Sequence, residues 1–185
     1  MDFNPNNYLS LLQNTLAAVE REKISRLASK LEVLRGTDRT LFLAGNGGSA
    51  ATASHAACDL SKTIAGENRK AIRAICLNDN VPLLTAWAND SGYKEVFSGQ
   101  LKNLGQKGDM FIAISASGNS ENILEALAAA KQMGMETFGF LGFDGGKAKS
   151  LADDFLLVPV QDFGIVEDIH MIIFHMITDY FKKLS

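Results

Sequence analysis

The sequence predicts a three-layer α/β domain, in which helices cover both faces of a five-stranded parallel sheet. Short apolar segments alternate with helical segments along the chain, and this alternation is typical of β–α–β units. Residues 111–114, Phe-Ile-Ala-Ile, are apolar on both sides of a strand, as a doubly covered sheet requires. A length of 185 residues suits one domain, and no linker or repeat divides the chain, so we expect a single domain over residues 1–185.

The first element is expected to be a long helix. From about residue 8 to residue 34, leucines and other aliphatic residues recur at steps of three and four, with charged residues between them. This period predicts one helix of roughly 25 residues. Such a helix is longer than a small sheet, so we expect its apolar face to pack against another subunit.

The remaining elements follow from the same patterns. Short runs rich in aliphatic and aromatic residues predict strands, and longer segments with apolar residues on one face predict helices. The expected strands cover residues 40–44, 71–77, 109–114, 136–141 and 155–158, and the expected helices cover residues 50–62, 82–87, 94–104, 119–133 and 164–183. The last helix is apolar almost all round, which predicts that it is buried.

Composition and charge narrow the class of protein. The formal net charge is -3 and no long basic run occurs, so nucleic acid is not expected as a direct partner. The chain has no stretch of about eighteen apolar residues, so we expect no membrane span. The first residues lack the basic start and apolar core of a signal peptide, so we expect a cytoplasmic protein. Cys58 and Cys76 lie in apolar stretches without a Cys-x-x-Cys pair, and both are expected to be small buried residues.

The clearest local pattern is the loop over residues 115–120, Ser-Ala-Ser-Gly-Asn-Ser, which follows a buried strand and opens a helix. Free backbone N–H groups at a helix N-terminus suit an anion, and the three hydroxyls add further donors. Gly118 lets the backbone turn close to a ligand. Taken alone, the same residues fit a simple helix cap equally well.

A second loop, Gly-Asn-Gly-Gly-Ser over residues 45–49, has the same position between a strand and a helix. Two such loops at the carboxyl ends of strands would border one crevice, which is the usual ligand position in open α/β sheets. Neither loop has the glycine spacing of the common nucleotide-binding loops. The sequence therefore favours a small phosphate ester, and we expect no nucleotide cofactor.

Two further segments carry ionisable side chains. His55 and Asp59 are four residues apart and share one helix face, either for chemistry or as a plain surface contact. In the last helix, His170 is expected to be a core histidine bonded to backbone. Glu167 and His175 are eight residues apart, roughly 12 Å along an ideal helix, so one metal ion is not easily held by both. Either the helix begins after Glu167, or the two residues serve different copies of the site across an interface.

Both loops, together with His55, resemble the signature segments of SIS (sugar isomerase) domains. The resemblance is closer to the sedoheptulose 7-phosphate isomerase (phosphoheptose isomerase) branch and extends through residues 84–90, 143–147 and 167–175, which covers nearly the whole chain. It implies a flavodoxin-like fold and a homotetramer with active sites at subunit interfaces, in which residues 1–35 are expected to take part. It also implies aldose–ketose isomerisation of a phosphorylated sugar, whose product supplies heptose units for surface lipopolysaccharide.

The resemblance also assigns residues. The substrate-binding positions it implies are Asn46, Gly47, Gly48, Ser49, Asp59, Asn89, Asp90, Ser115, Ala116, Ser117, Ser120 and Glu167. The metal positions it implies are His55, Asp59, Glu167 and His175, for one Zn²⁺ per site. Asp59 and His175 are expected to be catalytic, because isomerisation needs groups that move protons between adjacent carbons and their oxygens. Which of the two takes the carbon-bound proton stays open.

Two of these positions depart from the family. The family usually has glutamate where this chain has Asp59, and glutamine where it has Glu167. The departures favour a rival hypothesis, a non-catalytic SIS domain that binds a phosphosugar as a sensor or binds a replication initiator as an adaptor. The retention of four ionisable groups favours the isomerase. A sugar-responsive transcription factor is a third alternative, but the chain has no helix-turn-helix segment.

Overall fold

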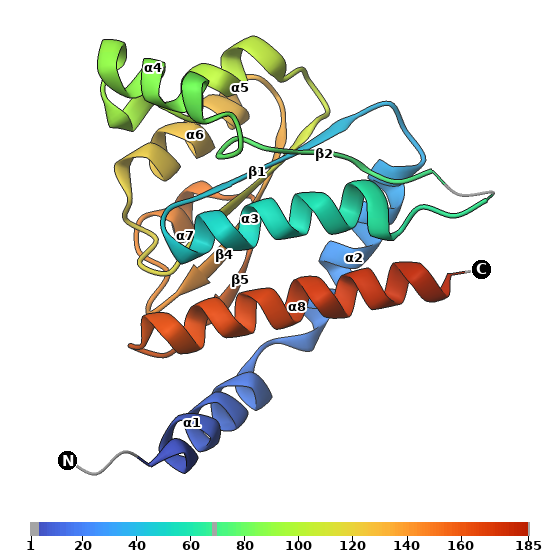
Figure 1. The fold of residues 1–185 in the computed structure, drawn as a ribbon, viewed down its shortest axis with the longest axis vertical. Helices are drawn as coiled ribbons and strands as arrows, with labels where there is room; N and C mark the ends of the chain where they lie inside the picture. The colour runs from blue at the N-terminus through green and yellow to red at the C-terminus, as the bar shows by residue number, and fades with distance from the viewer. Residues whose placement is uncertain (1–3, 68–69, 185) are drawn as a thin grey trace.

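The computed structural model describes residues 4–67 and 70–184 and forms a three-layer α/β domain (Figure 1). Its strands are β1 (Thr40–Gly45), β2 (Arg73–Cys76), β3 (Met110–Ser115), β4 (Glu136–Gly142) and β5 (Asp154–Val158). All neighbours pair in parallel, in the order β2-β1-β3-β4-β5. The strand order reverses between β1 and β3, so the topological switch point lies between these two strands. The predicted five-stranded, doubly wound sheet is confirmed.

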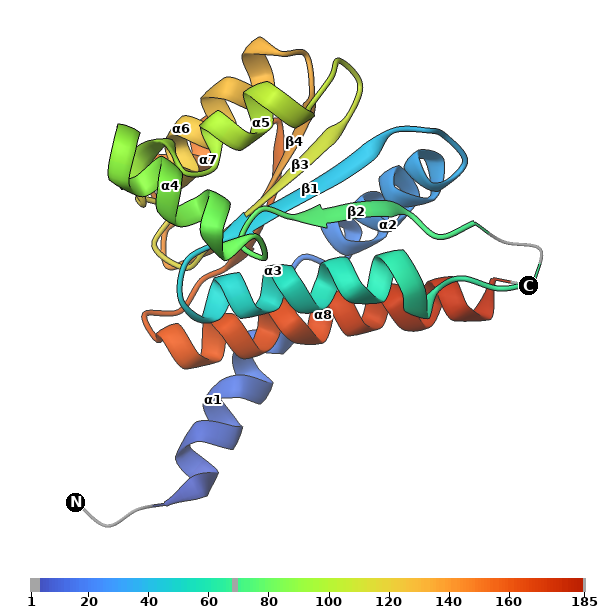
Figure 2. The same ribbon diagram turned by 45° about the horizontal axis from the view of Figure 1, so that its top comes forward.

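Helices cover both faces of this sheet. The helices of the described residues are α1 (Pro5–Ala18), α2 (Arg21–Arg35), α3 (Gly48–Cys58), α4 (Val81–Ser91), α5 (Ser98–Leu104), α6 (Glu121–Gln132), α7 (Ala148–Leu151) and α8 (Phe163–Lys183). Two short turns complete the list, the π-helical η1 (Asp59–Thr63) and the 3₁₀-helical η2 (Tyr93–Glu95). One face is covered by α2, α3 and α8 and the other by α4 to α7, with α3 and α8 side by side (Figure 2). None of the described helices is long and apolar enough to cross a membrane.

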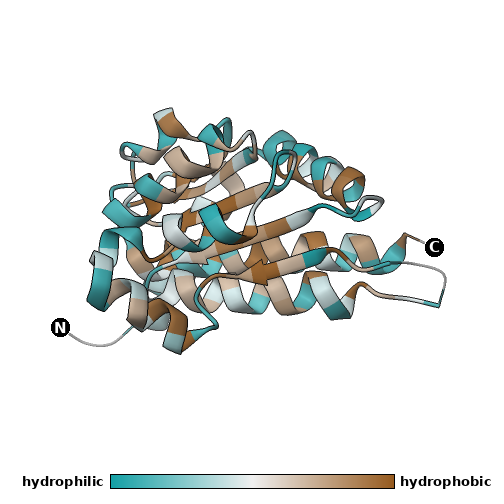
Figure 3. Cartoon of the chain, turned by 90° about the horizontal axis from the view of Figure 1, so that it is seen from above, coloured by the Kyte–Doolittle hydropathy of each residue, from teal (hydrophilic) through white to brown (hydrophobic). Residues whose placement is uncertain are grey.

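The core lies on both sides of the central strand β3, all of whose residues are buried. Met110, Ile112 and Ile114 pack against the α3–α8 layer, while Phe111 and Ala113 pack against α5 and α6. Figure 3 shows hydrophobic residues along the strands and polar residues on much of the outer helices. The two-sided apolar strand read from the sequence is thus the centre of the fold.

The N-terminal segment differs from the prediction. The single helix expected over residues 8–34 is divided into α1 and α2, because Val19 and Glu20 have extended backbone. The Val19 side chain is buried in the core, whereas α1 projects away from the domain and buries only Thr15 (Figures 1 and 2). Burial of Val19 redirects the chain at a point that no glycine or proline marks. α1 stays tied to α8 through the Tyr8 hydroxyl, which donates to Asp168 Oδ2 at 2.7 Å.

Three smaller expectations also need correction. The helix expected over residues 94–104 is two elements, η2 and α5, and the short α7 was not predicted. α8 buries one face only, since Met176 and Tyr180 are about half exposed. Cys76 is buried as expected, but Cys58 is exposed, because α3 turns its other face, with Ala53 and Ala56, to the core.

His170 is the core histidine that the sequence predicts. It is fully buried, its Nε2 donates to the carbonyl oxygen of Leu141 at 3.3 Å, and its ring meets Phe140 edge-on. Burial lowers the pKa of His170 to about 4, since a charged ring would lose its hydration. The histidine is therefore neutral in the folded protein at neutral pH.

This burial predicts a pH-dependent stability. Between about pH 6.5 and pH 4 the unfolded chain binds a proton on His170 that the folded chain does not, so the free energy of unfolding falls as pH is lowered. The contribution approaches about 1.4 kcal/mol per pH unit. The contribution of His170 is measured by denaturing the wild type and the His170→Leu variant at several pH values. It is the difference between the two proteins in the slope of the free energy of unfolding against pH. Parallel pH profiles for the two proteins would contradict the expectation.

Candidate functional site

The two loops predicted from the sequence lie together at the switch point. They follow β1 and β3, which pair directly, and they border a cleft of about 100 Å³. The cleft is lined by Asn46, Ser49, Ile114, Ser115, Ala116, Ser117, Ser120, Phe163 and Glu167. Its volume is well below the roughly 300–1,000 Å³ of pockets that enclose drug-sized ligands. A space of this size is large enough for a phosphate group, and the rest of a ligand would extend out of it.

The serine loop leaves its N-cap side chain without a capping role. Ser120 is the N-cap residue of α6, yet its side chain makes no capping hydrogen bond. Gly118 adopts a positive φ of 63°, and its N–H donates to Ser115 Oγ at 3.1 Å. The N–H of Asn119 donates to Ser117 Oγ at 3.2 Å, so the loop closes on itself while Ser120 stays available. The lack of a capping bond from Ser120 favours the anion-site interpretation, which stays a prediction.

The glycine-rich loop opens α3 in the same way. Gly47 is the N-cap residue, with a positive φ of 56°, and no side chain caps the helix. Gly48 packs directly under the carboxylate of Glu167, and a Cβ at this position would overlap that group. Glu167 therefore lies at the N-terminus of α3, where the helix dipole favours negative charge. The same carboxylate forms one wall of the cleft beside the serine loop.

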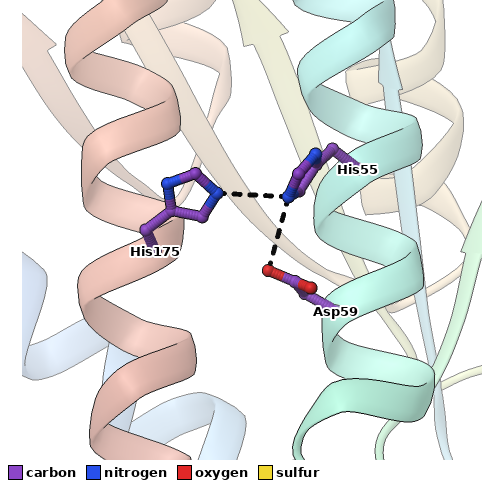
Figure 4. Close-up of side chains that lie close together, drawn as sticks. All are labelled: His55, Asp59 and His175. Atoms are coloured by element: carbon purple, nitrogen blue, oxygen red, sulfur yellow. Dashed lines mark hydrogen bonds and ion pairs between the residues drawn. The ribbon is translucent and has the colours of Figure 1, made fainter.

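A second group of side chains lies further along α3 and α8. His55, Asp59 and His175 each offer a ligand atom within 4.8 Å of the others (Figure 4). The Nε2 atoms of the two histidines are 3.1 Å apart, and Asp59 Oδ2 is 3.6 Å from His55 Nε2. Two imidazole nitrogens and a carboxylate that converge in this way match the donor set of a divalent cation such as Zn²⁺. The trio is also suited to proton transfer, since all three groups titrate or accept protons.

Asp59 is held in place by a residue that sequence reasoning missed. Thr63 Oγ1 donates to Asp59 Oδ1 at 2.9 Å, which leaves Oδ2 directed at His55. Both residues belong to η1, where the N–H of Ile64 donates to the carbonyl oxygen of Asp59. Such a widened helical turn is frequent at functional sites. The sequence feature that could have indicated this contact is the hydroxyl side chain of Thr63, four positions after Asp59 and on the same helix face.

Glu167 does not join this trio within one chain. α8 begins at Phe163 and runs without a break past His175, which excludes the alternative that the helix starts after Glu167. Glu167 instead lines the serine-loop cleft, about two helical turns from His175. Its assignment as a ligand of the same ion is therefore not supported within a single subunit. A role across a subunit interface stays a prediction.

Asn89 and Asp90 are also separate from the cleft. They lie at the end of α4, where Asn89 Nδ2 donates to Asp90 Oδ1 at 2.8 Å. Asp90 lines a different depression together with Trp87. Within the single chain this pair does not line the serine-loop cleft, and its predicted substrate contacts stay a prediction.

The fold and the cleft define the class of protein: an α/β domain with a serine-lined cleft at its topological switch point. A family model described as SIS domain matches residues 6–142. The phosphoheptose isomerase of Helicobacter pylori is 40% identical, over 93% of this chain and 88% of the relative. That of Sulfurimonas denitrificans is 43% identical, over 88% of this chain and 81% of the relative.

Solved structures that are similar to this chain include members of the same family. The phosphoheptose isomerase GmhA from Neisseria gonorrhoeae superposes with a TM-score of 0.88 at 29% identity, with 97% of each chain covered. A phosphoheptose isomerase from Francisella tularensis gives a TM-score of 0.88 at 27% identity, with 96% of each chain covered. The chain belongs to the SIS domain family and, within it, to the phosphoheptose isomerases. The resemblance seen in the two loops is confirmed.

Proposed function

We propose that this chain is an aldose–ketose isomerase that converts sedoheptulose 7-phosphate to a heptose 7-phosphate, for surface polysaccharide synthesis. The observation that carries the proposal is the pairing of two sites on the same two helices. The serine-loop cleft lies at the start of α3 and α8, and the His55–Asp59–His175 trio lies further along them. Along α8, Glu167 in the cleft wall and His175 in the trio are roughly 12 Å apart, and an extended seven-carbon sugar phosphate spans a comparable length.

The residues have distinct roles in this proposal. Ser115, Ser117 and Ser120 bind the phosphate together with the N-terminus of α6. Asp59 and His175 move protons between C1, C2 and their oxygens, through an enediol. One Zn²⁺, held by His55, Asp59 and His175, would supply Lewis-acid polarisation of the sugar oxygens when bound. Thr63 keeps the Asp59 carboxylate oriented.

The proposal is tested by incubating the untagged protein with sedoheptulose 7-phosphate and other ketose phosphates. NMR is expected to show an aldose 7-phosphate product from the heptulose. Elemental analysis of the same preparation is expected to give about one metal ion per site. No product under any condition would overturn the isomerase, and full activity without stoichiometric metal would overturn the metal site alone.

The proposal includes a cytoplasmic homotetramer with sites completed at subunit interfaces. Its support is the apolar surface that the single chain leaves uncovered. Leu9 of α1 is 58% exposed, and Met176 and Tyr180 of α8 are 50% and 46% exposed. Analytical ultracentrifugation tests the assembly.

One observation favours the second candidate, a non-catalytic phosphosugar-binding or adaptor domain. Glu167 places a carboxylate in the cleft that would hold the phosphate, and like charges repel. This alternative would be supported if the wild-type chain binds the sugar without turnover and the Asp59→Glu variant isomerises it.

The repulsion predicts the effect of Glu167→Gln. The variant is expected to bind sedoheptulose 7-phosphate roughly tenfold more tightly, about 1.4 kcal/mol, because it removes a negative charge beside the phosphate. Isothermal titration calorimetry measures this change. Glu22→Gln, on the exposed surface of α2, makes the same change in net charge and is expected to bind like wild type. Equal affinity in all three proteins would mean that Glu167 does not face the phosphate.

A further inference from the structure

The amide of Asn46 is held by three hydrogen bonds that join three parts of the chain. Asn46 Nδ2 donates to Asn122 Oδ1 at 2.9 Å, and Asn122 Nδ2 donates back to Asn46 Oδ1 at 2.9 Å. The hydroxyl of Tyr93 donates to the same Asn46 Oδ1 at 2.9 Å. Asn46 belongs to the loop after β1, Asn122 to the first turn of α6, and Tyr93 to η2. Asn122 is only 3% exposed, so this pairing is largely shielded from water.

These contacts determine what Asn46 can offer to a ligand. A side-chain amide has two acceptor sites on its oxygen and two donor hydrogens on its nitrogen. Asn122 and Tyr93 occupy both acceptor sites, and Asn122 takes one of the two hydrogens. The remaining capacity is one N–H of Nδ2. Asn46 lines the serine-loop cleft, so a hydrogen bond from its side-chain amide to a ligand there would use this donor and not the oxygen.

The pair also fixes the distance between the two loops. Asn122 lies two residues after the serine loop, in the first turn of the helix α6 that this loop opens. Asn46 lies in the glycine-rich loop on the other side of the switch point. A reciprocal amide pair resists rotation of either side chain, because rotation would break two hydrogen bonds in a shielded place.

We infer that Asn122 and Tyr93 are positioning residues, which lock the Asn46 amide as a hydrogen-bond donor to an oxygen of the phosphosugar. This inference rests on the proposed function, since it takes a phosphorylated sugar as the ligand of the cleft. It concerns ligand binding: Asn122 and Tyr93 act through Asn46 and move no proton of the reaction.

A double-mutant cycle tests the inference. Asn122→Leu keeps a branched side chain of similar size, removes both hydrogen bonds to Asn46 and changes no charge. Loss of one oriented donor to a phosphorylated ligand is expected to raise Kd and KM for sedoheptulose 7-phosphate about tenfold, with kcat within about threefold of wild type. Asn46→Ala is expected to have a similar effect. The double variant is expected to bind no more weakly than Asn46→Ala alone, because Asn122 acts only through Asn46.

Tyr93→Phe provides a second variant that keeps the fold. Tyr93 is 53% exposed, so removal of its hydroxyl leaves the core unchanged. Tyr93→Phe is expected to raise Kd for sedoheptulose 7-phosphate about threefold in the wild-type background and not at all in the Asn46→Ala background. Losses that add in either cycle, or unchanged Kd in Asn122→Leu and Tyr93→Phe, would overturn the inference.

The cycle is read by calorimetry and therefore does not need turnover. A wild-type protein that binds the sugar but does not isomerise it contradicts the proposed function, while the cycle still decides the inference. Additive losses in a protein that does isomerise the sugar contradict the inference alone. A wild-type protein that binds no phosphosugar overturns both.

Discussion

Replacement of Asp59 by asparagine is expected to lower kcat/KM for sedoheptulose 7-phosphate by roughly 10²–10⁴-fold, the usual range for loss of a general acid or base. Asparagine has almost the same shape, and its carbonyl oxygen can still accept the hydrogen bond from Thr63. The variant removes the negative charge and the proton acceptor that lie 3.6 Å from His55. Because the structure keeps its other contacts, the loss is expected in kcat with a small change in thermal stability.

Two further variants make this result specific. Asp38→Asn makes the same chemical change at an exposed position outside the trio and is expected to behave like wild type. Asp59→Glu restores the residue that the family usually has and is expected to keep turnover. Metal content, measured on the same preparations, is expected to fall in Asp59→Asn, since one anionic ligand is lost. Wild-type kcat/KM in Asp59→Asn would remove Asp59 from the mechanism.

The largest effect on the phosphate site is expected from Gly118→Ala. Gly118 has a positive φ of 63°, and an added Cβ would overlap the carbonyl oxygen of Gly145. The obstacle is backbone and not a flexible side chain, so the serine loop or the loop after β4 has to move. The free energy of unfolding is expected to fall by about 2–4 kcal/mol. Affinity for sedoheptulose 7-phosphate is expected to fall roughly 100-fold, because the N–H groups and hydroxyls of the loop lose their common orientation.

Gly36→Ala is the matched control. Gly36 has an ordinary helical φ of -76°, and the nearest heavy atom to an added Cβ lies at 3.7 Å. This variant is expected to match or slightly exceed wild-type stability, because alanine reduces the freedom of the unfolded chain. Chemical denaturation and calorimetry compare the two variants. Equal stability and affinity in both would show that the loop tolerates a different conformation at Gly118.

Sequence reasoning was most successful where the pattern is local. The two-sided apolar strand at residues 111–114 and the serine loop after it needed only neighbouring residues to be recognised. The break at Val19 could not be recognised in this way, because it results from burial of one side chain against distant elements. The exposure of Cys58 was missed for a related reason, since an apolar stretch on a helix still has an outward face.

The candidate site depends even more on contacts between residues that are distant in the sequence. His55 and His175 were named because family motifs fall on them, yet their contact joins residues far apart in the chain. The Asn46–Asn122 pair has no sequence signature, because an asparagine in each loop is equally consistent with turns and caps. The family motif implies both a substrate-binding and a metal-binding role for Glu167, and the unbroken course of α8 places its carboxylate in the serine-loop cleft, away from the trio of its own chain.

The separation of the two histidines has a consequence for how the protein is made. His55 and His175 are 120 residues apart, and α8 supplies both His175 and the Glu167 wall of the cleft. On the ribosome, the sheet strands and both loops emerge before α8 does. The trio and the Glu167 wall of the cleft are therefore complete only once α8 has formed and docked beside α3, so a nascent chain that ends before α8 lacks both.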